Sequence, residues 1–371
     1  MRLVYCLLSP TFGMHQYTAD LANRMVEHHE IHLVTVSSYP ADRYAPDVHV
    51  HSPADLDSTG LSLTGLGVKT LLKFRAALES LKPDLVHFTG PHLWNPYLLA
   101  WLRKRGTPVI HTLHDLEPHS GTPLRPLLKV WNKSVLRQAD RIVIHGQRFQ
   151  RQLVRSGIPE DQISYLPLLH LFLGYQRTKI LNNDLGEVTY DPLILFFGRI
   201  KPYKDVGTLI EAYHRFQEYG VDKNCKDQKL ILAGPGNLPA EWEDKLPPGV
   251  IWHNNLIADE EAESLFRRCS ILVLPYSDAT QSALIAAAYF FHKPVVVTRS
   301  GALPEYVSEG ETGFVVPPSD VGALASKLQI ALSDSGRLKV MGDSSRKWYD
   351  ENRSRETDAL AKLYEISHTA I

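Results

Sequence analysis

The sequence contains little cysteine and no excess of either charge. Its 371 residues include three cysteines, Cys6, Cys225 and Cys269. They are too far apart for a thiolate metal site and too few for a disulfide framework, so we expect a reducing compartment and a cytoplasmic protein. The 40 basic and 41 acidic residues leave a net charge of −1, so no global field exists to hold a nucleic acid.

Long apolar runs are missing as well. The opening run at residues 3–8 is short, follows one arginine and leads into no small-residue cleavage pattern, so we expect neither secretion nor a membrane span. With 44% hydrophobic and 22% charged residues, the composition is that of a globular protein and excludes disorder and fibres. At about 150 residues per domain, the length predicts two domains.

Short apolar strands alternate with amphipathic helices along the first half of the chain. The expected strands are 3–8, 32–36, 85–88 and 108–112, and the expected helices include 68–81 and 96–105. This alternation is typical of a parallel sheet with helical crossovers.

The same pattern restarts after a polar stretch at 176–191. Further strands are expected at 193–197, 230–233, 250–252, 271–275, 295–298 and 314–316, with a helix at 206–219. We therefore predict an α/β protein with two doubly wound, Rossmann-like domains, 1–175 and 192–340, and helices at 341–371 that return to the first domain. Ligands of such sheets bind beyond the carboxyl ends of the strands, and the two domains would face each other across a cleft.

The loop after the strand at 193–197 carries the strongest candidate site. Arg199 and Lys204 follow a buried strand and precede a helix. A guanidinium, an ammonium and helix N–H groups together suit a diphosphate. The alternative is a solvated basic loop, because lysine and arginine are mostly exposed.

A second cluster, 276–283, also lies between a strand and a helix. We expect Thr280 to cap a helix that begins near Gln281, which would leave the N–H groups of Gln281 and Ser282 for an anion. Capping alone would explain Thr280 and Ser282 equally well.

Loop glycines and a histidine–aspartate pair complete the candidates. Gly13, placed before the first helix, would allow close approach of a phosphate or sugar, and Gly234 follows another strand; a tight turn is the alternative for both. His114 closes the strand at 108–112, with Asp115 placed to orient or charge it, unless it is a structural histidine bonded to backbone.

These residues, in this order and spacing, resemble a family 4 glycosyltransferase of the two-domain GT-B fold. The similarity runs over nearly the whole chain. Its signposts are Gly13, 83–87 (Pro-Asp-Leu-Val-His), His114-Asp115, Gly198-Arg199, Lys204, Gly234-Pro235-Gly236, 293–298 (Lys-Pro-Val-Val-Val-Thr), 301–305 (Gly-Ala-Leu-Pro-Glu), Gly310 and Gly313.

The resemblance implies a retaining hexosyltransferase. Such an enzyme moves a sugar from a nucleotide-diphosphate sugar to a hydroxyl of a glycan, lipid-linked or small-molecule acceptor, commonly in polysaccharide or glycolipid synthesis, without a metal or other cofactor. His114, Arg199 and Lys204 match catalytic positions. The implied donor contacts are Gly13, Arg199, Lys204, Gly234, Leu256, Ile257, Thr280, Gln281 and Ser282. His87 and His92, which flank 88–91, and Asp115 are expected on the acceptor side.

The chain departs from the family pattern at two glutamates. The usual pair falls on Ala279 and Ala287, although the family uses the first to contact the donor sugar and the second to contact the ribose. The local sequence resembles a branch with Thr-Gln-Ser here, so we expect Thr280 and Gln281 to take over donor contacts. The alternatives are a noncatalytic nucleotide- or glycan-binding protein on the same scaffold, an epimerase on a related fold, or glycosylation of a small-molecule metabolite. The family glycine before Lys293 is replaced by His292.

A basic amphipathic stretch remains at 124–141. Arg125, Lys129, Lys133, Arg137 and Arg141 recur every fourth residue opposite apolar side chains. A helix of this kind can lie against the anionic inner face of a membrane. A solvated helix face is the alternative.

Overall fold

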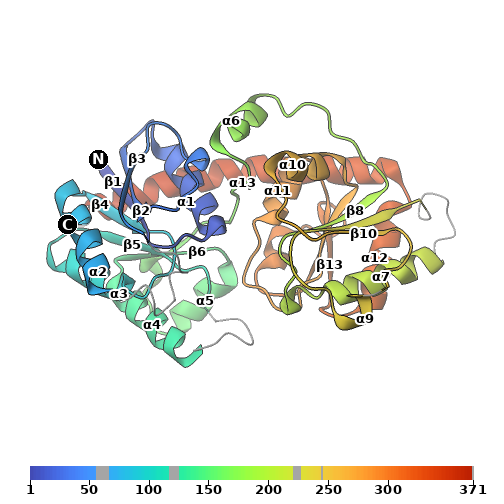
Figure 1. The fold of residues 1–371 in the computed structure, drawn as a ribbon, viewed down its shortest axis with the longest axis horizontal. Coiled ribbons are helices and arrows are strands. Elements are labelled where there is room, and N and C mark those ends of the chain that lie inside the picture. Colours follow the sequence, from blue (N-terminus) through green and yellow to red (C-terminus); the bar gives the residue numbers. More distant parts are fainter. Residues whose placement is uncertain (56–66, 117–124, 220–226, 244, 370–371) are drawn as a thin grey trace. The chain divides into compact units, whose positions relative to one another are not determined.

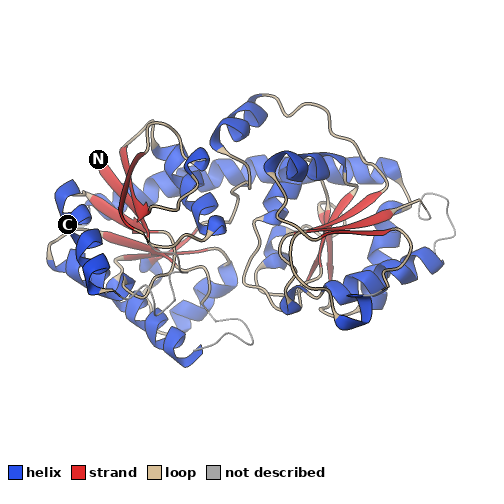
Figure 2. Cartoon of the chain, viewed as in Figure 1, coloured by secondary structure: helices blue, strands red, loops and turns tan. Residues whose placement is uncertain are grey.

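The computed structural model describes residues 1–55, 67–116, 125–219, 227–243 and 245–369. The chain divides into two compact units, unit 1 with Met1–Ile180 and Ser354–Ile371, and unit 2 with Leu181–Arg353. In each unit, helices cover both faces of one sheet (Figure 2). The prediction of two doubly wound α/β domains is therefore confirmed.

Unit 1 contains a seven-stranded parallel sheet with the order β3-β2-β1-β4-β5-β6-β7 (Figure 1). Its strands are β1 (Arg2–Leu7), β2 (Glu30–Val36), β3 (His49–Ala54), β4 (Leu85–Phe88), β5 (Val109–Thr112), β6 (Arg141–Ile144) and β7 (Ile163–Tyr165). The helices are α1 (Phe12–Met25), α2 (Val68–Leu81), α3 (Asn95–Lys104), α4 (Arg125–Gln138), α5 (Gln147–Arg155), α6 (Tyr175–Asn183), which runs into unit 2, and the end of α13 (Ser335–Thr369).

Unit 2 contains a six-stranded parallel sheet with the order β10-β9-β8-β11-β12-β13. Its strands are β8 (Leu193–Phe197), β9 (Lys229–Ala233), β10 (Val250–His253), β11 (Ile271–Leu274), β12 (Val295–Thr298) and β13 (Gly313–Val316). The helices are α7 (Val206–Tyr219), α9 (Ala240–Glu243), α10 (Asp259–Arg268), α11 (Leu284–Phe290), α12 (Val321–Leu332) and the start of α13. None of the helices among the described residues is long and apolar enough to cross a membrane.

The central strands are apolar throughout because both faces of each sheet are covered. All residues of β11 and β12 are buried, as are those of β4. These are the segments that continuous apolar runs predicted.

Three strands of unit 1, β3, β6 and β7, escaped prediction. The edge strand β3 keeps polar side chains at its exposed positions, and β7 has three residues. The predicted basic helix over 124–141 also requires correction: α4 ends at Gln138, and Arg141 begins β6, where its backbone pairs with Ile110. Residue 124 lies outside the described residues. The polar stretch at 176–191 is partly helical, as α6.

Candidate functional site

The loop after β8 places the side chain of Lys204 against Gly198, the first residue of the same loop. Gly198 has a φ of +107°, and a Cβ at this position would lie 2.9 Å from Lys204 Nζ. A short 3₁₀ turn, Pro202–Lys204, and Asp205 with a φ of +48° then lead into α7. Gly198 is therefore required both for its backbone conformation and for the space that the lysine occupies.

Lys204 and Arg199 carry charges that no described residue neutralises. The ammonium of Lys204 lies 5.1 Å from the ring centroid of Tyr276 and 5.8 Å from that of Phe196. Burial lowers the pKa of this lysine. Arg199 is exposed, and neither side chain forms a hydrogen bond or ion pair within the described part of the chain. Two unpaired cations beside a partly buried loop can hold an anion.

Backbone hydrogen bonds fasten this loop to the loop after β11. The carbonyl of Tyr203 accepts from Ser277 N at 2.8 Å and from Ser277 Oγ at 3.1 Å. The strands β8 and β11 are neighbours in the sheet. The structure thus places Lys204 and the 276–283 cluster together at the carboxyl ends of adjacent strands, as the topology of a parallel sheet requires.

The predicted helix cap at Thr280 is wrong. Helix α11 begins at Leu284, and Ala283 is the N-cap residue. Thr280 is buried, and its carbonyl accepts from Ala302 N at 2.9 Å. This segment packs on Gly301, where a Cβ would collide with the Ala279 carbonyl.

Two further loops join the same edge of unit 2. Gly234 has a φ of +140°, and a Cβ there would lie 2.5 Å from the Gly198 carbonyl. Gly236 N donates to Asn254 Oδ1 at 3.0 Å, which ties the loop after β9 to the loop after β10. There Leu256 is 75% exposed, and Ile257 is partly exposed. Close backbone packing therefore accounts for Gly234 without a ligand.

In unit 1, Gly13 lies in the first turn of α1 and not in the loop that precedes it. A Cβ on Gly13 would meet no atom within 4 Å. Neither packing nor a positive φ requires a glycine at this position, and its missing side chain leaves open space.

His114 follows β5 and is buried. Its Nε2 donates to the carbonyl of Thr89 at 2.9 Å, and the ring of Tyr17 stands edge-on to it at 5.0 Å. Burial lowers the pKa of His114 and outweighs the opposite effect of the Asp115 charge. The expectation that Asp115 charges His114 is therefore corrected: the imidazole is neutral, with its proton on Nε2.

His87 belongs to the core of unit 1, so its predicted place on the acceptor side is wrong. It is fully buried; Nδ1 bonds the hydroxyl of Tyr364 at 2.9 Å and Nε2 bonds that of Thr112 at 2.8 Å. The Tyr364 hydroxyl also bonds Tyr5, and the Thr112 hydroxyl bonds Tyr17. Five buried polar groups thus satisfy one another in a continuous chain.

His92 is buried as well. Its Nδ1 accepts from Trp94 N at 3.1 Å, and its carbonyl accepts from Trp131 Nε1 at 3.0 Å. These bonds give His92 a structural role that its sequence position did not indicate. Among the described residues, no group of three or more histidine, cysteine or acidic side chains is placed to hold a metal.

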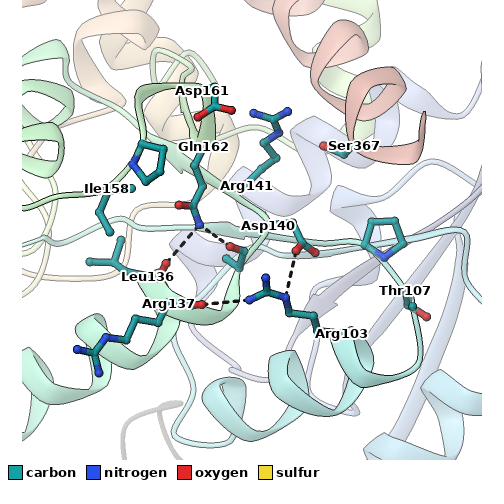
Figure 3. A pocket seen from close by; sticks show the side chains of 14 residues that line it. Arg103, Thr107, Leu136, Arg137, Asp140, Arg141, Ile158, Asp161, Gln162 and Ser367 are labelled. Carbon is teal, nitrogen blue, oxygen red and sulfur yellow. Dashed lines mark hydrogen bonds and ion pairs between the residues drawn. The ribbon is translucent and has the colours of Figure 1, made fainter. Parts of the chain in front are cut away.

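A pocket of about 540 Å³ opens at the opposite edge of the unit 1 sheet, where β5, β6 and β7 begin (Figure 3). Two of its polar side chains bond backbone carbonyls: Arg103 Nη1 donates to the Arg137 carbonyl at 3.2 Å, and Gln162 Nε2 donates to the Ala139 carbonyl at 2.6 Å. Arg103 also pairs with Asp140. These groups close helix and strand ends, and no sequence motif marks the pocket.

Two family models match the chain. Residues 12–168 match the glycosyl transferase 4-like domain, and residues 191–334 match the glycosyl transferases group 1 domain. Two similar curated proteins are D-inositol 3-phosphate glycosyltransferases. The one from Corynebacterium efficiens is 25% identical over 77% of this chain and 72% of its own length. The one from Corynebacterium glutamicum is 24% identical over 90% of this chain and 86% of its own length.

Solved structures share the fold at lower identity. Sucrose-phosphate synthase from Thermosynechococcus elongatus aligns over all of both chains with a TM-score of 0.73 and 18% identity. HepE from Anabaena, solved in complex with UDP and glucose, aligns over 98% of this chain and 99% of its own, with a TM-score of 0.72 and 15% identity.

Proposed function

The chain is a glycosyltransferase of the GT-B fold, family 4 type, and from this premise we propose that it transfers a hexose from a nucleotide-diphosphate sugar with retention of configuration. Unit 2 binds the donor. The observation that carries the proposal is the pair of unneutralised cations, Arg199 and Lys204, at the carboxyl end of β8. HepE, which shares the fold, binds UDP.

In this proposal the cations Arg199 and Lys204 stabilise the leaving diphosphate. Negative charge builds up on the leaving diphosphate as the glycosidic bond breaks, and cations already in place stabilise that charge without reorganising. Lys204 is partly desolvated, which strengthens its attraction for the phosphoryl oxygens. Losing one such group typically costs on the order of 3 kcal/mol of transition-state stabilisation.

The remaining donor contacts come from the joined loops of unit 2. Gly234, Leu256 and Ile257 would lie along the nucleotide, since the loops after β9 and β10 are tied to the cationic loop. The segment with Thr280, Gln281 and Ser282 would contact the sugar and phosphates in place of the two family glutamates. Gln281 and Ser282 are partly exposed and accessible to a ligand.

Unit 1 would supply the acceptor side. His114 is neutral, so its free Nδ1 can accept a hydrogen bond from a sugar hydroxyl, and the open space at Gly13 leaves room for a phosphate or sugar. We propose a hydroxyl acceptor on a glycan, a lipid-linked sugar or a small molecule, because the curated relatives act on an inositol phosphate. The diphosphate oxygen takes the acceptor proton, and no metal is required.

A panel of nucleotides tests the donor site. Thermal unfolding of the full chain is followed with UDP, GDP, ADP and dTDP and with the corresponding monophosphates. One diphosphate at about 100 times its Kd should stabilise the protein by about 2.7 kcal/mol. Lys204→Ala should lose this shift, whereas Lys201→Ala, an exposed lysine of the same loop, should keep it. If no nucleotide stabilises the wild type, the donor site is refuted.

A noncatalytic nucleotide-binding protein is the second candidate function. Ala279 and Ala287 occupy the positions of the two family glutamates, and both are buried. An alanine methyl group cannot make the contacts of a carboxylate. Such a protein would bind a diphosphate but release none from a nucleotide sugar. Turnover of any donor by the wild type rejects this candidate.

We also propose a peripheral membrane contact through α4. Lys129, Lys133 and Arg137 are exposed, and Leu127 and Val130 are 46% and 66% exposed on the same helix. Exposed apolar groups among cations suit an anionic lipid surface. Binding to vesicles with anionic lipid should fall as salt rises; binding that does not respond to salt, or no binding, rejects the contact.

A further inference from the structure

Tyr276 carries a buried hydroxyl that nothing in the described structure satisfies. The residue follows β11, its side chain is 3% exposed, and its hydroxyl makes no hydrogen bond within the described residues. Burial raises the pKa of Tyr276, and a side-chain interaction with the Ser282 hydroxyl lowers it by less, but this pair does not reach the geometry of a hydrogen bond. The Ser282 oxygen instead accepts from Leu284 N at 3.4 Å.

The hydroxyls of two other buried tyrosines of unit 2 are satisfied. The Tyr289 hydroxyl bonds the Tyr306 carbonyl at 3.0 Å and Thr312 Oγ1 at 2.8 Å. The Tyr213 hydroxyl donates to the Gln228 carbonyl at 2.8 Å. A buried hydroxyl without a partner costs folding free energy, so the exception at Tyr276 requires a reason.

The ring that carries the unsatisfied hydroxyl lies beside the unsatisfied cation. Lys204 Nζ is 5.1 Å from the centroid of the Tyr276 ring, and the two loops are joined through the Tyr203 carbonyl. A desolvated O–H donor and a desolvated ammonium therefore belong to joined loops at the carboxyl ends of β8 and β11. An anionic oxygen is the ligand that satisfies both groups.

We infer that the Tyr276 hydroxyl donates a hydrogen bond to a phosphoryl oxygen of the nucleotide diphosphate that Lys204 binds. The inference rests on the proposed function and adds a residue to its donor site.

Two tyrosine variants of the full chain test the inference. The diphosphate that stabilises the wild type is titrated calorimetrically into Tyr276→Phe and Tyr289→Phe. Tyr276→Phe should weaken binding about tenfold or more, since a hydrogen bond to a charged group is lost, and should leave the Tm unchanged or raised. Tyr289→Phe should lower the Tm and leave the affinity unchanged.

The outcomes separate this inference from the proposed function. If Lys204→Ala loses binding while Tyr276→Phe binds like the wild type, the inference is overturned and the donor site stands. A fall in Tm for Tyr276→Phe as large as that for Tyr289→Phe would make the hydroxyl structural and overturn the inference as well. If the wild type binds no diphosphate, the proposed donor site fails and the inference fails with it.

Discussion

A buried hydrogen-bond network in unit 1 and the joined loops after β8 and β11 in unit 2 treat their polar groups in opposite ways. In unit 1, Tyr5, Tyr364, His87, Thr112 and Tyr17 bond one another in an unbroken buried chain. In unit 2, the loops after β8 and β11 bring Lys204 and Tyr276 together without partners in the described structure. A satisfied buried group stabilises the fold, whereas an unsatisfied group beside an unpaired cation can be completed by a ligand. Buried atoms without a hydrogen-bond partner among the described residues occur in both units, among them Trp94 Nε1 and His111 Nδ1 in unit 1, so the comparison concerns these two clusters only.

Acid should destabilise unit 1 more than unit 2, and this is the largest effect that we predict. Burial lowers the pKa values of His15 and His92 to about 4 and of His87 and His111 to about 3. All four lie in unit 1. Between pH 6.5 and these values the unfolded chain binds more protons than the folded chain. The free energy of unfolding therefore decreases as the pH is lowered, by up to about 1.4 kcal/mol per pH unit for each group.

The measurement is hydrogen exchange at pH 7 and pH 5 in moderate urea, with peptides assigned to each unit and exchange corrected for pH. Peptides of unit 1 should lose protection at pH 5 well before those of unit 2. Equal loss in both units would contradict the neutral state of the buried histidines.

Removing His87 should also destabilise unit 1. His87→Leu deprives Tyr364 and Thr112 of one buried hydrogen bond each, which should lower the free energy of unfolding by about 1–3 kcal/mol. Tyr5→Phe, which removes a group bonded to Tyr364 at one end of the chain of hydroxyls, should cost less. Urea unfolding measures both variants. If both lose the same free energy of unfolding, His87 at the centre of the network contributes no more than Tyr5 at its end.

The opposite effect is expected at Lys204. A partly buried cation without a partner opposes folding, so Lys204→Met should raise the free energy of unfolding by about 1 kcal/mol in the absence of nucleotide. Lys201→Met should change it little, because this lysine is exposed. If replacing Lys204 lowers the free energy of unfolding, its ammonium has a stabilising partner. That result would contradict the comparison between the satisfied network around His87 and the unsatisfied groups of the loops after β8 and β11.

The smallest predicted effect tests a departure from the family sequence. His292 adopts a φ of +56° after α11, with its N–H bonded to the Tyr289 carbonyl and that of Lys293 bonded to the Ala288 carbonyl. This is a helix C-terminus that favours glycine. His292→Gly should stabilise unit 2 by about 0.5–1 kcal/mol relative to His292→Ala, which loses the same contact to Asp343 but keeps the Cβ. The urea midpoints of the two variants are compared. If His292→Ala is the more stable of the two, the positive φ at this position does not strain the backbone.

The sequence predicted those parts of the fold that follow from local patterns. Apolar runs located β4, β8 and β12, since covered strands have no polar face. It missed β3 and β7, whose pairing depends on neighbouring strands more than on their own composition. Helix α11 starts later than expected, at Leu284, and the carbonyl of Thr280 packs against Gly301 before the helix begins.

The candidate site was predictable in part. Basic residues after a buried strand indicated Lys204 and Arg199, because position relative to a strand end can be recognised locally. Tyr276 and His87 could not be assigned this way. The unsatisfied hydroxyl of the first and the bonded nitrogens of the second depend on residues distant in sequence, and only the folded chain shows them.

Turnover of a donor tests the central claim most directly. Release of nucleoside diphosphate from UDP-, GDP-, ADP- and dTDP-glucose is measured for the wild type, Lys201→Ala and Lys204→Ala. We predict that the wild type and Lys201→Ala consume one of these donors, and that Lys204→Ala does so at least about 100-fold more slowly, the rate equivalent of one lost charge contact. Equal rates for Lys204→Ala and the wild type would contradict the account.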